Sequence, residues 1–335
     1  MKNLVSIILP VKNTAQYLEA CLNSIVNQSY QEWELITVDD FSDDACWQIL
    51  TDYSQKESRI KVFRNNSPGI IDALNLGYGK SSGNYITRMD SDDVMPPQKL
   101  EDLKNHLDEI GSGTVVTGLV QYFSDKPISK GYQQYEQWLN HLTKTESNFE
   151  DIYKECPIAS ACWMILRNDF EKCGKFESQE YPEDYDLCFR FYQAGLKIKA
   201  VNDILHLWRE HPQRTSRTNQ NYHLDRFVDM KLAYFLNLEV VSPDTIVLWS
   251  AGYKSKDLAK RLQQKKLNFR WVCTNTKKIG TQIYGVNIED YNSISKISHP
   301  KIIVPIAVPK YQSQINAFFK SINLVSNRDY FFFSY

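Results

Sequence analysis

Short apolar runs alternate with amphipathic segments over the first 110 residues, and this alternation constrains the fold more than any other feature. The apolar runs are residues 5–10, 34–38, 59–63 and 84–89, each of a length typical of a buried strand. The segments between them, such as 14–28, have apolar residues three and four apart, as helices do. Strands separated by helices predict an α/β fold with a mostly parallel sheet flanked by helices.

Polar residues follow three of these predicted strands at the point where each strand ends. They are Pro10 to Lys12, Asp39-Asp40 and the segment Asp90-Ser91-Asp92-Asp93. Because the carboxyl ends of parallel strands meet at one edge of a sheet, ligands of open α/β sheets bind there. We therefore expect these side chains to surround one crevice.

Asp90, Asp92 and Asp93 are three carboxylates in close succession, and like charges this close repel one another. One interpretation is a solvated acidic loop in which Asp93 caps the helix expected to follow. The other is a divalent-metal site, since Mg²⁺ or Mn²⁺ binds one or two carboxylates and completes its shell with phosphates and water. Both interpretations are open from this segment alone.

Three further groups of polar residues each have a structural and a functional interpretation. Asp39-Asp40 suits a turn, or could accept a hydrogen bond from a nucleotide base. Glu183 and Asp184 suit the first turn of a helix, where acids stabilise the dipole, or could supply a general base. Arg209 and His211 suit a surface loop, or could neutralise a leaving diphosphate or complete a metal shell.

Composition and charge argue against several classes of protein. The net charge of −1 and the scattered Lys and Arg residues argue against nucleic-acid binding. No apolar run approaches the roughly 18 residues of a membrane span, and the first residues are expected to form a strand rather than a signal peptide. The seven cysteines include no C-x-x-C pair, which predicts reduced thiols in a cytoplasmic protein. The motifs H-E-x-x-H and G-x-S-x-G and the Walker loop are absent.

A second α/β pattern begins near residue 242, so we expect two domains, 1–241 and 242–335. The first is less regular after residue 113, with a polar connector between strands near 114–120 and 161–166. The second has a helix expected from Lys256, and its first turn, W-S-A-G-Y-K-S, keeps a single glycine. Dinucleotide binding through G-x-G-x-x-G is therefore not expected, and a structural, docking or dimerising role is.

Taken in order, these segments resemble the family-2 glycosyltransferases, which use nucleotide sugars and have the GT-A fold. The resemblance covers about residues 3–218, and the C-terminal part resembles small Rossmann-like α/β domains fused to bacterial glycan enzymes. Any one motif is weak, whereas several in this order and spacing are specific. The motifs are V-S-I-I-L-P-V-K-N, E-L-I-T-V-D-D-F-S-D-D, N-N-S-P-G-I-I-D-A-L-N-L-G, G-N-Y-I-T-R-M-D-S-D-D, P-E-D-Y-D-L-C-F-R and W-R-E-H-P-Q-R-T-S.

The resemblance implies a role for each candidate residue. Asp184 would be the catalytic base, supported by Glu183. Asp92, with Asp93 and His211, would hold the cofactor, Mn²⁺ or Mg²⁺. Lys12 stands where the family commonly has an aromatic residue. This leaves open whether a side chain at this position stacks on the base of the nucleotide. The nucleotide would be bound by Pro10, Lys12, Asp39, Asp40, Asn66, Arg88, Asp90 and Arg209.

The implied reaction is an inverting, metal-dependent transfer of a sugar from a nucleotide-diphosphate sugar, by resemblance a UDP-sugar. The acceptor would be a hydroxyl of a glycan or lipid-linked molecule in cell-surface polysaccharide synthesis. The protein is expected in the cytoplasm, and a lipid-linked acceptor would bring it to the inner membrane face as a peripheral protein. Homo-oligomerisation stays open.

Three other functions compete with this one. A non-catalytic nucleotide-sugar or carbohydrate-binding protein derived from a transferase would be expected to lose Asp184 or the D-x-D segment, which is Asp90-Ser91-Asp92. A sugar-nucleotide pyrophosphorylase would need a Gly-rich loop after the first strand. An oxidoreductase would need the glycines that the second domain lacks.

Overall fold

The computed structural model describes residues 3–176 and 179–334, and the chain forms two compact units. The first unit spans Met1–Phe149 and Pro157–Tyr222, and the second spans Glu150–Cys156 and His223–Tyr335. The division between units thus falls at residues 222 and 223. The domain boundary at 241 and 242 stays a prediction.

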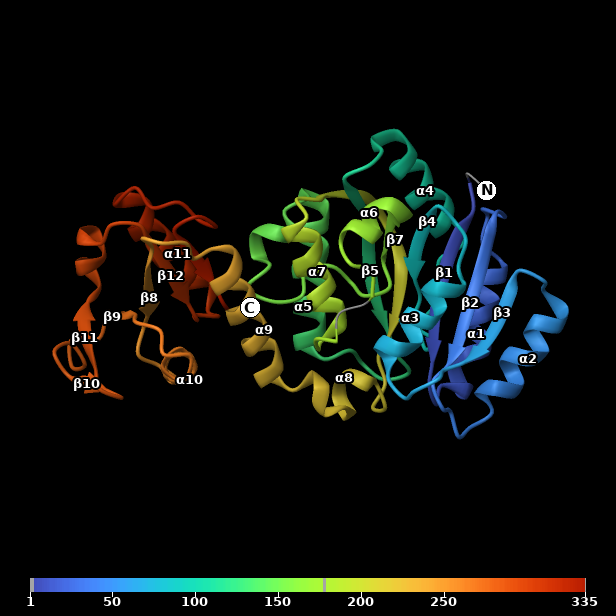
Figure 1. The fold of residues 1–335 in the computed structure, drawn as a ribbon, viewed down its shortest axis with the longest axis horizontal. Coiled ribbons are helices and arrows are strands. Elements are labelled where there is room, and N and C mark those ends of the chain that lie inside the picture. The colour runs from blue at the N-terminus through green and yellow to red at the C-terminus, as the bar shows by residue number, and fades with distance from the viewer. Residues whose placement is uncertain (1–2, 177–178, 335) are drawn as a thin grey trace. The chain divides into compact units, whose positions relative to one another are not determined.

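A seven-stranded sheet forms the centre of the first unit, in the order β3-β2-β1-β4-β6-β5-β7 (Figure 1). All neighbouring pairs are parallel except those of β6, which runs antiparallel to β4 and β5. The mostly parallel sheet predicted from the alternating pattern is therefore confirmed. Its strands are β1 (Val5–Val11), β2 (Trp33–Asp39), β3 (Ile60–Arg64), β4 (Tyr85–Arg88), β5 (Thr114–Phe123), β6 (Trp163–Leu166) and β7 (Lys197–Arg209).

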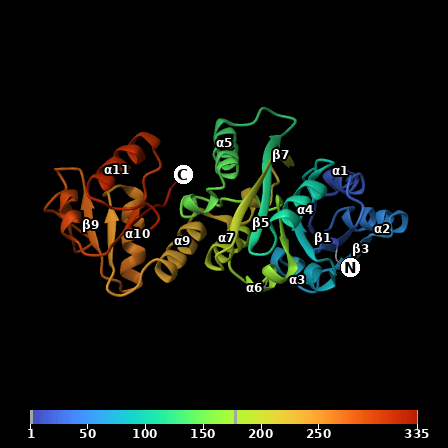
Figure 2. The ribbon, with the colours of Figure 1, turned by 90° about the horizontal axis from the view of Figure 1, so that it is seen from above.

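Helices cover both faces of this sheet. Successive residues of a strand point to opposite faces, and every residue of β1 and β2 is buried, so both faces are covered. The helical elements of this part of the chain are α1 (Ala15–Val26), α2 (Cys46–Lys56), α3 (Ile70–Lys80), α4 (Lys99–Ile110), α5 (Lys130–Thr145), η1 (Asn148–Asp151), α6 (Arg167–Lys172), α7 (Glu183–Gln193), α8 (Thr215–Thr218) and η2 (Gln220–Tyr222). Ile7 and Leu9 of β1 share one core with apolar residues of α1, α2 and α4. Ile8 points to the other face, where a Cβ added at Gly77 of α3 would lie 2.7 Å from it. Figure 2 accordingly shows α1 and α3 on opposite sides of β1.

The segment predicted to be a polar connector contains α5, so that prediction is wrong for these residues. The Ser129 side chain caps the helix by accepting a hydrogen bond from the backbone N–H of Tyr132. Leu139 and Leu142 are buried, and Trp138 packs against the same core. Leu142 lies three and four residues after Leu139 and Trp138, which is the helical spacing, but the preceding residues 130–137 are polar apart from a glycine and two tyrosines and obscure it.

The second unit contains a six-stranded sheet in the order β10-β11-β9-β8-β12-β13, parallel throughout except for the edge strand β10. Helix α10 begins at Tyr253 rather than at the predicted Lys256, because Gly252 is its N-cap. The smaller Rossmann-like α/β arrangement that was expected is confirmed. The elements are α9 (Leu224–Leu238), β8 (Thr245–Trp249), α10 (Tyr253–Gln264), β9 (Arg270–Cys273), β10 (Gln282–Ile283), β11 (Val286–Asp290), η3 (Tyr291–Lys296), β12 (Pro300–Val304), α11 (Pro309–Ser321) and β13 (Tyr330–Phe332).

Two further features concern the cysteines and the length of the apolar helices. All seven cysteines are buried and none of them forms a disulfide. Among the residues that the structure describes, no helix combines the length and the apolar character needed to cross a membrane.

Candidate active site

The carboxyl ends of β1, β2 and β4 meet at one edge of the first sheet, because these strands are parallel neighbours. Val11 lies opposite Asp39 in the register, and the Asp40 N–H donates to the Val11 carbonyl at 2.8 Å. On the other side of β1, Ile8 lies opposite Arg88. The three polar segments predicted to share a crevice therefore follow adjacent strands.

Asp40 is surrounded by hydrogen-bond donors beyond the end of β2. Its Oδ1 accepts from Asn65 Nδ2 at 2.7 Å and from the Gly69 N–H at 2.8 Å, and its Oδ2 lies 3.2 Å from Lys12 Nζ. Gly69 has a φ of 143°, which other residues rarely adopt. Asn65 thus contacts Asp40, and the side chain of its neighbour Asn66, predicted to bind the nucleotide, is exposed to solvent.

Asp39 differs from Asp40 because one of its carboxylate oxygens is unsatisfied. The residue is 3% exposed, and its Oδ1 accepts no hydrogen bond from any residue that the structure describes. A buried oxygen without a donor costs free energy, so it marks a place where a ligand N–H would be accepted. Pro10 is buried beside it in β1, opposite Val38 of β2.

Two of the three carboxylates after β4 have separate partners, which relieves their mutual repulsion. Asp90 accepts from Arg88 Nε at 2.9 Å and from Ser160 Oγ at 2.8 Å. Asp92 Oδ2 lies 2.8 Å from His211 Nε2. The D-x-D segment is thus held from three directions, by β4, by the segment before β6 and by the loop after β7.

Asp93 is directed into the core and away from Asp92. It is 1% exposed, its Oδ1 accepts from the Arg209 N–H at 2.7 Å, and its Oδ2 lies 2.9 Å from His206 Nε2. Burial raises the pKa of Asp93 and lowers the pKa of His206, so both groups favour their neutral forms. This geometry favours a supporting role for Asp93 over the metal-ligand role predicted from the sequence.

Arg209 and His211 both lie against the ring of Tyr17 in α1. Arg209 Nε donates to the Asp92 carbonyl at 2.7 Å, and its guanidinium carbon is 4.7 Å from the Tyr17 ring centroid. The imidazole centroid of His211 is 4.6 Å from the same ring. His211 Nδ1 is buried and bonds to no described residue. The loop that contains Arg209 and His211, called the R-x-H loop below, therefore contacts Asp92 of the D-x-D segment.

Asp92 and His211 are the pair of side chains best suited to a divalent cation. A cation whose shell includes substrate phosphates needs few protein ligands, and carboxylate with imidazole suits Mn²⁺. Within residues 3–176 and 179–334, no three His, Cys, Asp or Glu side chains gather as a metal cluster. These residues therefore fit a site of low ligand count and do not fit a closed protein cage.

Helix α7 has three acidic residues in its first turn, and of these only Asp184 is partly exposed. Asp186 is buried and pairs with Arg190 Nε at 2.8 Å. Asp184 Oδ1 accepts from the Tyr185 N–H at 2.8 Å. Desolvation, and after it the negative charge of Glu183, raises the pKa of Asp184 to about 7. A carboxylate with a pKa near neutrality is suited to general base catalysis.

A chain of ionic hydrogen bonds joins α7 to the D-x-D segment. Arg88 Nη1 donates to Glu183 Oε1 at 3.0 Å, while Arg88 Nε donates to Asp90. Glu183 Oε2 accepts from the Tyr222 hydroxyl at 2.5 Å. The predicted residues Arg88, Asp90 and Glu183 are thus in direct contact. Ser160 and Tyr222 were not predicted, because neither belongs to a motif that could be recognised.

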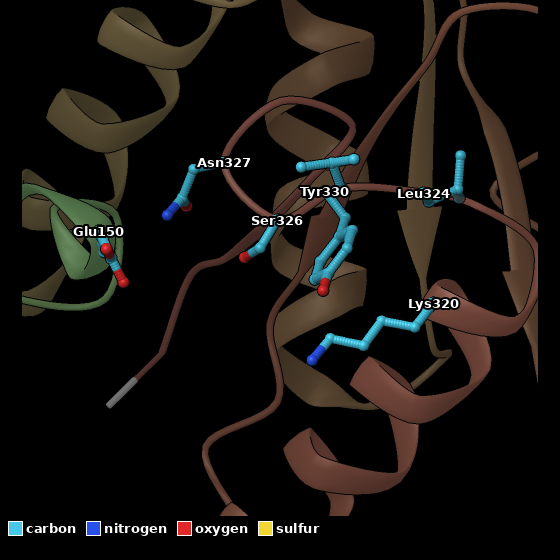
Figure 3. A pocket seen from close by; sticks show the side chains of 7 residues that line it. Glu150, Lys320, Leu324, Ser326, Asn327 and Tyr330 are labelled. Atoms are coloured by element: carbon cyan, nitrogen blue, oxygen red, sulfur yellow. The ribbon is translucent and has the colours of Figure 1, made fainter.

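A separate hollow of about 530 Å³ lies in the second unit (Figure 3). None of the predicted site residues lines it. The candidate chemistry therefore belongs to the first unit. The hollow is lined by Glu150, Lys320, Leu324, Val325, Ser326, Asn327 and Tyr330.

Comparison with known proteins connects this geometry to a family. The chain matches the family model described as Glycosyl transferase family 2 over residues 6–174. It belongs to this family. The matched residues include the Asp39-Asp40 and D-x-D segments, whereas α7 and the R-x-H loop lie beyond them.

Curated relatives of this family-2 glycosyltransferase come from several bacteria. Uncharacterized glycosyltransferase RT0329 of Rickettsia typhi is 30% identical, over 65% of this chain and 67% of its own length. An uncharacterized glycosyltransferase of Haemophilus influenzae is 27% identical, over 70% of this chain and 75% of its own length. Glycosyltransferase GlyG of Streptococcus pneumoniae is 27% identical, over 65% of this chain and 74% of its own.

A solved structure shares the fold. The crystal structure of S. aureus TarS 1-349 in complex with UDP-GlcNAc aligns with a TM-score of 0.55 at 19% identity. The alignment covers 72% of this chain and 68% of that one. At this level of identity the likeness shows the fold, which is the mostly parallel GT-A type of sheet flanked by helices.

Proposed function

We propose that this glycosyltransferase moves a sugar from a UDP-sugar to a hydroxyl of a glycan or lipid-linked acceptor, with inversion at the anomeric carbon. The observation that carries the proposal is the direct connection between a base and a diphosphate site. Asp184 has a pKa raised to about 7, and its neighbour Glu183 is joined through Arg88 to Asp90 of the D-x-D segment. Proton removal and departure of the diphosphate would then occur side by side.

The unsatisfied Asp39 oxygen supports a role in binding the nucleotide base. Uracil presents one ring N–H, and the buried Oδ1 of Asp39 is an acceptor that bonds to no described residue. Asp40 is already held by Asn65, Gly69 and Lys12 and would keep the segment after β2 in place beside Asp39. The choice of UDP is further supported by TarS, whose structures contain UDP and UDP-GlcNAc.

Asp92 and His211 would hold Mn²⁺ or Mg²⁺. When bound, this cation supplies positive charge to the diphosphate. Arg209, held on the Asp92 carbonyl, would lie along the phosphates, and Asp93 would keep Arg209 in place. Arg88 is bonded to Asp90 and Glu183, so we propose that it acts by fixing these two carboxylates rather than by direct contact with the nucleotide.

The chemistry needs no nucleophile from the protein. The ionised Asp184 carboxylate takes the proton of the acceptor hydroxyl. The hydroxyl oxygen forms a bond to the anomeric carbon as the bond from that carbon to the diphosphate breaks, and the nucleoside diphosphate leaves. Attack on the side opposite the leaving group inverts the configuration.

The raised pKa of Asp184 predicts the pH dependence of turnover. Asp184 accepts a proton only when it is ionised, so turnover should rise as the pH increases through about 7 and level off above it. The measurement is turnover at saturating donor between pH 5.5 and 9, in buffers of matched ionic strength. A rate that stays constant across that range would contradict the assignment of Asp184 as the base.

Removal of the cation should abolish tight binding of the donor. We expect EDTA or Asp92→Ala to weaken binding of the donor on the order of 10²-fold, because the diphosphate charge is then uncompensated. Isothermal calorimetry with Mn²⁺ or Mg²⁺ measures this effect. Asp125→Ala is the matched control, since it removes an exposed carboxylate elsewhere in the same unit. Donor binding that is insensitive to both metal and Asp92 would contradict the D-x-D assignment.

A panel of donors tests the proposal as a whole. UDP-GlcNAc, UDP-glucose, UDP-galactose, GDP-mannose and a dTDP-sugar would each be assayed for binding and for hydrolysis with water as the acceptor. We expect one UDP-sugar to bind with metal and to be hydrolysed slowly. Binding of a donor without hydrolysis or transfer would instead support a non-catalytic nucleotide-sugar-binding protein.

A cytoplasmic location is part of the proposal. Nucleotide sugars and seven buried cysteines outside any disulfide are both compatible with the cytoplasm. A lipid-linked acceptor would bring the enzyme to the inner face of the membrane. Flotation with vesicles that carry undecaprenyl-diphosphate glycans, compared with plain vesicles, would test this part of the proposal.

A further inference from the structure

Tyr222 holds one oxygen of Glu183, and neither the motifs nor the family match account for this contact. Tyr222 ends η2, beyond the residues 6–174 that match the family. Its hydroxyl donates to Glu183 Oε2 at 2.5 Å, and Arg88 donates to the other oxygen, Oε1, at 3.0 Å. The Glu183 carboxylate is therefore clamped from two sides, by β4 and by η2.

The clamp lies directly beside the proposed base. Glu183 precedes Asp184 in the first turn of α7, and its charge raises the pKa of Asp184. The other charged groups that act on Asp184 are Arg88 and Asp90, and Asp184 in turn acts on the hydroxyl of Tyr222. The orientation of the Glu183 carboxylate thus sets the distance between two negative charges at the site.

We propose that Tyr222 is a positioning residue of the transfer reaction, which fixes the Glu183 carboxylate against Arg88 and thereby sets the orientation and basicity of Asp184. The inference rests on the proposed function, in which Asp184 is the base. Tyr222 also links the two sides of the site. The segment 209–222 contacts the D-x-D segment at its start, and at its end the Tyr222 hydroxyl contacts Glu183 of α7. One segment therefore contacts both the D-x-D side and the base side of the site.

Loss of the Tyr222 hydroxyl should have a particular signature in the pH profile. Glu183 Oε2 would lose its donor, so the Glu183 carboxylate would be held by Arg88 alone and could turn toward Asp184. Closer approach of the two negative charges makes the ionised form of Asp184 less favourable, so its proton is released at higher pH. The acidic limb of the turnover profile should therefore move to higher pH.

The test compares Tyr222→Phe with Tyr78→Phe. Both substitutions remove a hydroxyl that donates to a glutamate, since Tyr78 bonds to Glu171 Oε1 at 2.9 Å in the same unit. The Phe ring at 222 keeps the edge contact with Tyr181, whose centroid lies 6.2 Å away. The readout is release of nucleoside diphosphate from the sugar nucleotide that the donor panel selects, measured from pH 5.5 to 9.

We expect Tyr222→Phe to lower turnover at pH 7 by about 10-fold, to leave the KM for the donor within about 2-fold, and to shift the acidic limb upward by about half a pH unit to one unit. Part of the turnover should return at pH 9. Tyr78→Phe should change thermal stability to a similar extent with no shift of the limb. A Tyr222→Phe variant with an unshifted limb, or with the same loss at every pH, would overturn the proposal and leave Tyr222 a purely structural role.

Failure of this inference can be distinguished from failure of the proposed function. If Asp184→Asn keeps wild-type turnover, the base assignment is wrong, and the Tyr222 proposal is overturned with it. If Asp184→Asn is inactive and Tyr222→Phe matches Tyr78→Phe, the proposed function stands and the positioning role of Tyr222 is rejected.

Discussion

Asp184→Asn should lower turnover by about 10³-fold while binding of the donor stays within a few-fold of wild type. The amide is almost the same size as the carboxylate and can still accept the Tyr185 N–H, so α7 should keep its start. It cannot take a proton from the acceptor hydroxyl. Single-turnover release of nucleoside diphosphate measures the chemical step, and calorimetry with the unhydrolysed donor measures binding.

Asp186→Asn is the matched control for this prediction. It makes the same chemical change two positions further along α7, where the carboxylate is buried and pairs with Arg190 rather than facing solvent. We expect this variant to melt at a lower temperature and to keep turnover while it is folded. Equal loss of turnover in the two variants would mean that charge in the first turn of α7, rather than a base at position 184, supports the reaction.

Local patterns predicted the elements that carry the site. The strand before Asp39 and the strand before Asp90 are short and rich in apolar residues, and parallel pairing on the two sides of β1 brings their carboxyl ends to one edge. The acidic start of α7 and the loop at Arg209 were also recognisable, because each is a short motif within a regular element. Helix α5 was missed because its first half, residues 130–137, is polar apart from a glycine and two tyrosines, so the apolar spacing begins only at Trp138.

Contacts between distant segments could not be predicted in the same way. Asn65 and Asn66 are identical neighbours in the sequence, and the contact of Asn65 with Asp40 depends on the turn between β3 and α3. Asp92 and Asp93 are adjacent acids, and the side chain that enters the core is decided by His206 at the other end of a buried hydrogen bond. Alternation along the strand gives no information about a partner more than a hundred residues away.

These contacts explain how three aspartates can lie so close together. Asp90 is compensated by Arg88, Asp92 lies against His211, and Asp93 is buried where its neutral form is favoured. Neighbouring groups of the protein therefore offset most of the repulsion among these three carboxylates, and a cation would be needed mainly for the charge of the diphosphate. This predicts a folded enzyme in EDTA that has lost tight donor binding, which thermal melts with and without metal can check.

Arg88→Met should destabilise the first unit by about 3–5 kcal/mol and abolish turnover. Arg88 is 5% exposed and is ion-paired with both Glu183 and Asp90, so its loss leaves these two carboxylates without the cation that they share. Urea unfolding followed by circular dichroism measures the free energy, and donor hydrolysis measures the activity. Arg59→Met is the matched control, because Arg59 makes two hydrogen bonds to Glu57 in a partly exposed pair of the same unit that contacts none of the proposed site residues. Its loss should cost about 1 kcal/mol and leave turnover unchanged.

The double variant Arg88→Met with Glu183→Gln separates charge from packing. If the cost of Arg88→Met arises from a stranded carboxylate, neutralising Glu183 should restore at least half of the lost stability, since replacing a whole buried pair costs much less than breaking one. Turnover should not return, because Asp184 would then lack both the charge of Glu183 and the connection to Asp90. A double variant as unstable as the sum of its two single variants would instead assign the role of Arg88 to packing.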